Sequence, residues 1–326
     1  MGGGFPSGTA TNQKSPEEAL PILLTMGEPA GIGPEIVRAA FDQLGGRIGQ
    51  RPLKIVGDEN LFAGYAPRVI ATRAKVKAVP GRPDPINNAA VTEAIEIAVK
   101  ACLAGEAAAL VTAPIHKAVL LQTGFPFPGH TEFLGALTGA HRAVMMLASD
   151  ALRVVPLTIH TPLAEVPPAI TGEAIVETAR IMLDALKRDF GVASPRLAVA
   201  GLNPHAGEDG KLGKEDAKII APAVAVLRAE GHRVRGPFSA DTLFHEEARK
   251  TYDAVLTMYH DQGLIPIKTL SFWDGVNVTL GLPIVRTSPD HGTAFDIAGT
   301  GKADVRSMIA AIRMAATMAD ARAKAR

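Results

Sequence analysis

Short apolar runs alternate along this chain with longer segments that have a helical pattern. Residues 21–27, 52–58 and 108–115 are apolar stretches ended by Gly or Pro, which is typical of buried strands. Residues 89–105 have the length and alanine content of a helix that ends at Gly105. Strands that alternate with helices predict a mostly parallel sheet covered by helices on both faces.

The alternation continues in the second half of the chain. We expect Thr171 to cap a helix that stops at Gly191. Its apolar side chains recur at the helical spacing i, i+4, i+7 and i+11, at Ile175, Ala179, Met182 and Leu186. A second helix, ending at Gly231, has its apolar stripe at Ile220, Ala223 and Leu227.

Two stretches interrupt this rhythm. Residues 124–133 are rich in Pro and Gly and resemble a crossing between domains. Residues 275–304 are dense in Gly and polar residues, with short β-like pieces between them. Polar loops of this length are uncommon unless they are functional, so this segment is a candidate part of a site.

Composition narrows the class of protein. A chain of 326 residues with 47% hydrophobic residues can bury more core than one domain usually needs. The 34 basic and 33 acidic residues nearly cancel, which gives no reason to expect nucleic acid or a membrane surface as a partner. The polar N-terminus is no secretory signal, so we predict a cytoplasmic protein with a flexible tail over residues 1–19. Cys102, the single cysteine, excludes an intrachain disulfide.

Three histidines follow apolar runs that are typical of buried strands: His160, His205 and His260. Loops at the carboxyl ends of parallel strands meet at one crevice, where three imidazoles can bind a divalent metal and leave one coordination position open. Asp261 directly follows His260 and is suited to orient its imidazole. The alternative is three separate hydrogen-bonded histidines, and the spacing between them matches no short zinc motif.

Two further motifs each have a functional and a purely structural interpretation. The glycine-rich segment 27–35 precedes a helix and suits an anion at its N-terminus, but a tight turn with Pro34 early in the helix explains it as well. His130 and Thr131 follow a Pro-Gly turn and suit hydrogen bonding to a polar substrate. Alternatively, Thr131 caps a helix and His130 is merely exposed.

The C-terminal third contains the remaining candidates. Lys268, Asn277 and Arg286 would recognise a phosphate if they converge, since Arg offers a bidentate fork; otherwise they are ordinary surface residues. Residues 291–304 place Gly and small residues around two aspartates. This segment either wraps a nucleotide through its backbone or is a well-packed loop.

Together these segments resemble the 4-hydroxythreonine-4-phosphate dehydrogenase family of vitamin B6 biosynthesis. The motifs that carry the resemblance are TMGEPAGIGPEI, VTAPIHK, GHTEF, GLNPHAGE, ADTLF, MYHDQGL and NVTLGLPIVRTSPDHGTAFDIAG. They span about residues 24 to 304. The segment HGTAFDIAG also resembles the nucleotide loop of the isocitrate and isopropylmalate dehydrogenases, to whose fold this family is related.

The resemblance implies an α/β fold of two α/β/α domains with a mixed, mostly parallel sheet. Residues 20–125 with 270–326 would form the first domain, with the nucleotide loop. Residues 126–269 would form the second, with the metal site and dimer contacts. It also implies a homodimer with a shared active site, to which the partner contributes His260.

The resemblance further implies roles for individual residues. The metal ligands would be His160, His205 and His260. The contacts to a phosphorylated small-molecule substrate would be His130, Thr131, Lys268, Asn277 and Arg286. The cofactor-binding residues would be Gly292, Thr293 and Ala294.

The expected reaction is metal-dependent oxidation of a secondary alcohol by NAD or NADP, followed by loss of CO₂. The metal would be Zn²⁺, Mg²⁺ or Co²⁺, and Asp241, Asp261 and Lys117 are the acid/base candidates. Related members act on phosphothreonate, phosphoerythronate or dihydrodiol carboxylates, and residues 271–275 are a place where such substrates could be distinguished. Two rival classes stay open: a metal-dependent lyase that uses no nucleotide, and a non-catalytic binding protein that has kept the fold.

Overall fold

The computed structural model describes residues 19–127 and 129–325. The predicted tail, residues 1–19, lies outside the described residues except for its last position. Strands and helices alternate along the described chain, as the sequence predicts.

The strands are short, and most of their residues are buried. In chain order they are β1 (Ile22–Thr25), β2 (Arg47–Ile48), β3 (Arg51–Gly57), β4 (Val69–Ala71), β5 (Ala109–Thr112), β6 (Val144–Ala148), β7 (Arg153–Pro156), β8 (Arg196–Ala200), β9 (Arg233–Phe238), β10 (Ala254–Thr257), β11 (Val276–Leu280) and β12 (Arg286–Pro289).

Most of the longer α-helices pack against strands of the sheet. In chain order the α-helices are α1 (Gly33–Gln43), α2 (Asn88–Leu103), α3 (Lys117–Leu121), α4 (His130–Thr138), α5 (Val166–Ala169), α6 (Gly172–Arg188), α7 (Ala221–Ala229), α8 (Glu246–Arg249), α9 (His260–Leu270) and α10 (Arg306–Ala325). A π-helical turn, Asp216–Ile220, leads into α7.

The described strands form one continuous sheet in the order β2-β3-β1-β5-β12-β11-β6-β7-β10-β8-β9, with β4 beside β3. Pairing is parallel from β3 to β12 and again from β7 to β9. Between these two parts, β12, β11, β6 and β7 pair antiparallel, one with the next. Three successive antiparallel pairs reverse the strand direction, so the two parallel parts run in opposite directions. The predicted mixed, mostly parallel α/β sheet is confirmed.

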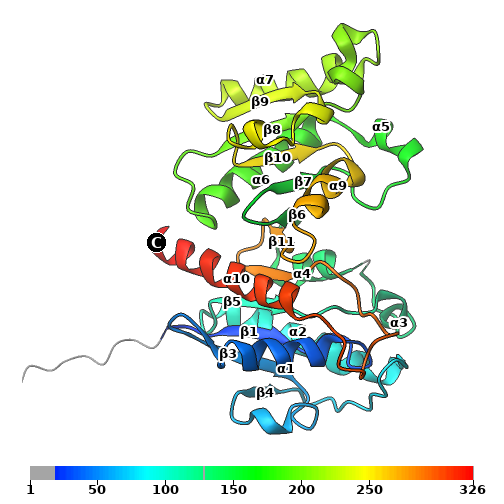
Figure 1. The fold of residues 1–326 in the computed structure, drawn as a ribbon, viewed down its shortest axis with the longest axis vertical. Helices are drawn as coiled ribbons and strands as arrows, with labels where there is room; N and C mark the ends of the chain where they lie inside the picture. The colour runs from blue at the N-terminus through cyan, green and yellow to red at the C-terminus, as the bar shows by residue number, and fades with distance from the viewer. Residues whose placement is uncertain (1–18, 128, 326) are drawn as a thin grey trace, which may run out of the picture.

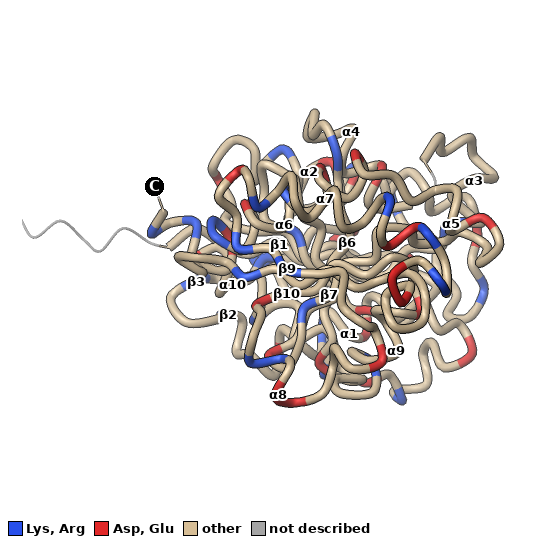
Figure 2. Tube along the Cα trace, turned by 90° about the horizontal axis from the view of Figure 1, so that it is seen from above, with Lys and Arg blue, Asp and Glu red and all other residues tan. Residues whose placement is uncertain are grey.

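The two parallel parts of the sheet lie at opposite ends of the molecule in Figure 1, with β11 and α10 between them. In sequence the first part holds residues 22–112 and β12, and the second holds residues 153–257. Because one sheet runs through both, the division into two domains stays a prediction. Figure 2 shows acidic and basic residues interspersed along the chain, in keeping with the net charge of +1.

The predicted helices form because each has one face that can be buried. Ile175, Ala179, Met182 and Leu186 of α6 are all fully buried, which confirms the stripe read from the sequence. Thr171 caps α6: its hydroxyl accepts a hydrogen bond from Ala174 N at 3.1 Å. The helix over residues 89–105 is also confirmed, as α2, and the chain leaves it through Gly105 at φ 74°.

Two further findings concern membrane-spanning helices and the single cysteine. No helix within residues 19–127 and 129–325 is long and apolar enough to cross a membrane. Burial raises the pKa of the Cys102 thiol to about 12, which favours packing over a role as a nucleophile.

Replacing the cap of α6 tests whether this helix is stabilised as the sequence indicates. We expect Thr171→Ala to lower the free energy of unfolding by about 1 kcal/mol, because the amide of Ala174 loses its acceptor. Urea unfolding followed by circular dichroism measures this change. Thr171→Ser, which keeps the hydroxyl, is the control and should stay close to wild type. Equal losses in both variants would show that the hydroxyl does not act as a cap.

Candidate active site

A cavity of about 820 Å³ lies over the strands where the sheet reverses direction. Its wall includes residues of both parts of the sheet, among them Thr112 at the end of β5 and His160 after β7. Of the residues predicted as functional, the cavity collects these: Lys117, His130, Thr131, His160, Asn277, Arg286 and Gly292. The sequence could not show that they share one wall, because they come from six different segments.

Arg286 is the most unusual residue of this wall. It opens β12 and is only 2% exposed. Its guanidinium donates to the hydroxyls of Thr279 at 2.9 Å and Thr112 at 2.6 Å, while its Nε has no partner. Among the described residues no carboxylate lies within 4.0 Å of it. Burial lowers the pKa of Arg286 to about 9, so the side chain remains a cation at neutral pH. Ordinary surface charge, the alternative at this position, is therefore wrong.

His130 lies in the same wall, and its Nε2 is buried without a partner. Burial holds the pKa of His130 well below its usual range, and the positive charge of Arg286 adds to this effect. A neutral imidazole at this point can donate or accept a hydrogen bond. The alternative interpretation, in which Thr131 caps α4 and His130 is exposed, is wrong, since α4 begins at His130 with Gly129 as its N-cap.

Asn277 and Lys268 approach the cavity in different ways. Asn277, in β11, lines it directly, and its Oδ1 is buried without a partner. Lys268 reaches the rim through an ion pair of 2.7 Å between its Nζ and Asp290 Oδ2. Asp290 itself belongs to the wall. The cavity therefore offers a buried cation, a neutral imidazole and an amide, a set that suits an anionic, hydrogen-bonding ligand.

Two of the three predicted metal ligands lie beside each other. His160 contributes to the main cavity and to a neighbouring one of about 430 Å³, which His260 and Asp261 also line. The centroids of the two imidazole rings are 6.1 Å apart. Nδ1 of His260 lies 2.7 Å from Asp261 Oδ1, so the carboxylate orients this ring as the sequence predicts.

His205 lies in a different setting, on the segment Pro204–Gly210 after β8. Five successive residues, 205 to 209, have φ between 43° and 81°, a region that only glycine adopts readily. The buried carboxylate of Asp216 holds the start of this segment by accepting from the amides of Leu202 at 2.8 Å and Asn203 at 3.1 Å. The carboxyl pKa of Asp241 is lowered, mainly by a hydrogen bond from Ser239 and in part by the charge of nearby His205.

Within one chain, the described residues contain no group of three or more His, Cys, Asp or Glu side chains that could hold a metal ion. His160 and His260 are brought together, and His205 is left apart with Asp241. The three-histidine site therefore stays a prediction, as does the subunit that supplies each imidazole.

The predicted nucleotide loop packs against the glycine-rich segment 27–35. Ile32 N donates to Thr293 O at 2.9 Å, and a Cβ on Gly31 would lie 2.7 Å from that oxygen, so only glycine allows this approach. Glu35, in the first turn of α1, accepts from the amides of Gly299 at 3.0 Å and Gly301 at 3.1 Å. The N-terminus of α1 is thus covered by protein, which favours the tight-turn interpretation of residues 27–35.

The sequence reasoning missed several residues of this site. Thr112 and Thr279 hold the guanidinium of Arg286, and Asp290 holds Lys268. His291 also lines the cavity, and its Nε2 is buried without a partner. The positions of Thr112 at a strand end and of Asp290 and His291 in the polar segment 275–304 were the available signals.

The fold and the cavity define an α/β enzyme with a cationic ligand site at the point where its sheet reverses. Comparison with known proteins then identifies the family. Residues 41–315 match the family model described as pyridoxal phosphate biosynthetic protein PdxA, and the chain belongs to this family. The 4-hydroxythreonine-4-phosphate dehydrogenase of Roseobacter denitrificans is 52% identical over 319 residues, which cover 92% of this chain and 97% of the relative.

Solved structures agree with this assignment. The 4-hydroxythreonine-4-phosphate dehydrogenase of Klebsiella pneumoniae superposes with a TM-score of 0.83 at 36% identity, covering 92% of this chain and 100% of that one. A beta-decarboxylating dehydrogenase from Thermococcus kodakarensis gives a TM-score of 0.51 at 18% identity, over 93% of this chain and 83% of that one. The second likeness concerns the fold alone. The resemblance of the sequence to this dehydrogenase family is confirmed.

The depressed pKa of His130 predicts how stability depends on pH. As pH falls below the ordinary imidazole value of 6.5, the unfolded chain takes up a proton at His130 that the folded chain does not. This residue therefore lowers the stability of the wild type toward acid, by at most about 1.4 kcal/mol for each pH unit. His130→Gln should lose less stability than wild type between about pH 7 and pH 5.

Urea unfolding at a series of pH values measures this difference in slope. His141→Gln is the matched control: it also removes one imidazole, at a side chain that is 94% exposed, and should keep the acid sensitivity that His130 causes. A His130→Gln slope equal to that of wild type would mean that His130 titrates normally in the folded protein.

Proposed function

We propose that this protein oxidises 4-hydroxythreonine 4-phosphate with NAD or NADP and a divalent metal, and releases CO₂ to give 3-amino-2-oxopropyl phosphate. The alcohol carbon loses a hydride to the nucleotide and its hydroxyl loses a proton. The resulting β-keto acid loses CO₂ and takes up a proton at carbon. The enzyme would act in the cytoplasm as a homodimer with a shared active site. The substrate is the one named for its relatives.

The observation that carries this proposal is the buried charge of Arg286. A guanidinium that is 2% exposed and lies beside no carboxylate is costly unless an anion joins it. At an effective dielectric near 20, one cation about 4 Å from a unit charge contributes roughly 4 kcal/mol. A phosphate group, which accepts two hydrogen bonds from one guanidinium, matches this position.

The other predicted substrate residues can complete the phosphate and substrate contacts. Nε2 of His130 and Oδ1 of Asn277 are polar atoms without partners in the same wall, so a ligand there would satisfy both. Thr131 adds a hydroxyl from the first turn of α4. Lys268 stands beside the rim with its charge balanced by Asp290, so it would act by reorienting toward the ligand.

The imidazoles fit a divalent metal by their chemistry. His160 and His260 lie side by side, and Asp261 fixes the ring of His260, an arrangement that suits Zn²⁺ or Co²⁺. As the family resemblance implies, His205 and His260 would come from different subunits of a dimer when the set is complete. A bound metal would supply Lewis acidity, which favours loss of the hydroxyl proton and stabilises the charge left after CO₂ departs.

The loop with Gly292, Thr293 and Ala294 is the proposed nucleotide site. Gly292 belongs to the cavity wall, so a nucleotide held here would reach the substrate. Ala294 has φ 44°, and its loop is held by the contact of Thr293 with Ile32. The nicotinamide would supply the hydride acceptor, while this loop fixes its position.

Three side chains are proposed to move protons. Asp261 lies against His260 and can hold a proton near the two imidazoles. Lys117, at the start of α3, lines the cavity and would protonate the carbon after CO₂ leaves. Asp241 lies near His205, so it would act only where His205 meets the other two histidines.

The first test is NADH or NADPH formation, followed at 340 nm with metal-loaded protein. The substrates to compare are 4-hydroxythreonine 4-phosphate, phosphothreonate and phosphoerythronate. Turnover of the first supports the proposal and identifies the nucleotide. Turnover of only the other two would support the same type of reaction on a different substrate. Release of CO₂ without reduced nucleotide would indicate a lyase.

Arg286→Met tests the phosphate contact. We expect KM for the phosphorylated substrate to rise roughly 100-fold, since a buried charge-assisted contact is lost, with a smaller change in kcat. Steady-state kinetics measures both constants. Arg286→Lys keeps a cation and should recover part of the loss. A KM unchanged in Arg286→Met would contradict the role of this residue.

A mixing experiment tests the shared site. His205→Ala and His260→Ala should each be inactive as homodimers. If these two histidines come from different subunits, random mixing gives heterodimers with one intact site, and roughly one quarter of wild-type activity returns. As the control, His205→Ala is mixed with an equal amount of wild type. The activity should then fall only in proportion to the share of wild-type subunits. No recovery after refolding the two variants together would mean that both histidines act within one chain.

A further inference from the structure

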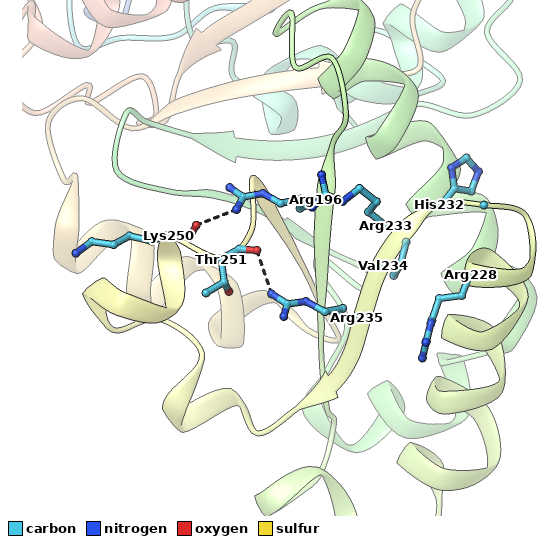
Figure 3. A pocket seen from close by; sticks show the side chains of 9 residues that line it. Arg196, Arg228, His232, Arg233, Val234, Arg235, Lys250 and Thr251 are labelled. Carbon is cyan, nitrogen blue, oxygen red and sulfur yellow. Dashed lines mark hydrogen bonds between the residues drawn. The ribbon is translucent and has the colours of Figure 1, made fainter.

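A second cavity, of about 700 Å³, lies at the amino ends of β8 and β9, at the edge of the sheet away from the strands that carry the proposed active site. Arg196 opens β8 and Arg233 opens β9, whereas His205 and His260 follow the carboxyl ends of β8 and β10. Figure 3 shows the side chains that line this cavity. The lining residues are Arg196, Arg228, Gly231, His232, Arg233, Val234, Arg235, Lys250 and Thr251.

The charges of this lining have one sign. Four arginines, one lysine and one histidine contribute to it, and no carboxylate does. Part of this charge is balanced from outside the lining. Asp253 pairs with Arg196 at 2.9 Å, Glu247 and Glu246 pair with Lys250 at 2.6 and 3.5 Å, and Glu230 lies 3.7 Å from His232. In residues 19–127 and 129–325, no carboxylate lies within 4.0 Å of the other three arginines, which are Arg228, Arg233 and Arg235.

The backbone directs these arginines to one side. Arg233 and Arg235 alternate along β9 with Val234, which is 1% exposed, so both arginines project from the face opposite the core. Arg196 is the register partner of Arg233 on the neighbouring strand. Like charges on neighbouring strands repel each other. The pairing of β8 with β9 therefore keeps Arg196 and Arg233 close together despite their repulsion.

The arginines also keep donors available. Arg235 uses Nη2 to donate to Thr251 O at 3.0 Å, and Arg196 uses Nη1 to donate to Lys250 O at 3.0 Å (Figure 3). These bonds fix the two guanidiniums over the segment before β10. Arg233 donates only to the Ser194 hydroxyl, at 3.3 Å. Each guanidinium has five N–H donors, so Arg233 and Arg235 keep most of theirs for a ligand. Arg196 keeps fewer, because its Nε and Nη2 also donate to Asp253.

We propose that this cavity is a binding site for a small, multiply charged phosphate-bearing anion, distinct from the substrate site. Several arginine side chains that line one cavity, with no carboxylate in its lining, match an anion with more than one charged phosphate. The concave shape favours a small molecule over a long polyanion, which a flat or ridged basic surface would suit. Elsewhere along the chain acidic and basic residues are interspersed, so the single sign is a property of this cavity (Figure 2).

The test is calorimetric titration of the whole protein with pyrophosphate as the probe. We expect two classes of site in the wild type, one in each cavity. Arg228→Gln/Arg233→Gln should weaken one class at least tenfold and leave the other, because two charge-assisted contacts are lost. Raising the salt concentration should weaken the same class. The KM of Arg228→Gln/Arg233→Gln for the dehydrogenase substrate should equal that of wild type, which separates this site from the proposed function.

The control is Arg68→Gln/Lys100→Gln, which removes two positive charges from exposed residues of the other part of the sheet. It should bind pyrophosphate as the wild type does. Binding by Arg228→Gln/Arg233→Gln that matches this control would overturn the proposal. So would a single-stranded oligonucleotide that binds the cavity more tightly than pyrophosphate, since that result would assign the surface to nucleic acid.

Discussion

The burial of one arginine in the middle of the sheet governs how the rest of this site is arranged. Arg286 stands on β12, whose neighbours are β5 on one side and β11 on the other. Each neighbour contributes a hydroxyl, Thr112 and Thr279, that accepts from the guanidinium in place of water. Two neutral acceptors stabilise the charge without cancelling it, so a positive potential persists in the wall. Burial lowers the pKa of the nearby His130 imidazole, and the charge of Arg286 adds to this effect.

The reversal of the sheet explains why so many polar groups meet at this point. If all strands ran parallel, β5 and β7 would each send a loop to the same edge, and the face of the sheet would be covered by helices. Antiparallel pairing of β12, β11, β6 and β7 instead opens the centre of the sheet, where side chains such as Asn277 and Met145 line a cavity. The polar segment 275–304 supplies two of the four strands of this reversal, β11 and β12.

Local patterns in the sequence predicted the elements but not their pairing. The stripes of α6 and the cap at Thr171 follow from spacing alone, since a helix buries residues that recur every three or four positions. The burial of Arg286 could not be predicted, because it depends on a parallel pairing with β5 across more than 170 residues of chain. The candidate residues of the cavity are predicted mainly from the resemblance to a family. Its motifs identify residues that meet in the fold, although local patterns do not show which strands pair.

The segment around His205 shows why a single chain leaves one imidazole apart. Residues 205 to 209 all have positive φ, and conformations of this kind persist only where the surrounding structure imposes them. Here Asp216 imposes them through three hydrogen bonds to Leu202 and Asn203, from a π-helical turn that itself departs from regular geometry. This loop, held by Asp216, fixes the position of His205 without any contact to His160 or His260. In the proposed dimer that rigidity would favour binding across the interface, since a histidine held in advance loses little entropy when the partner subunit brings a further ligand.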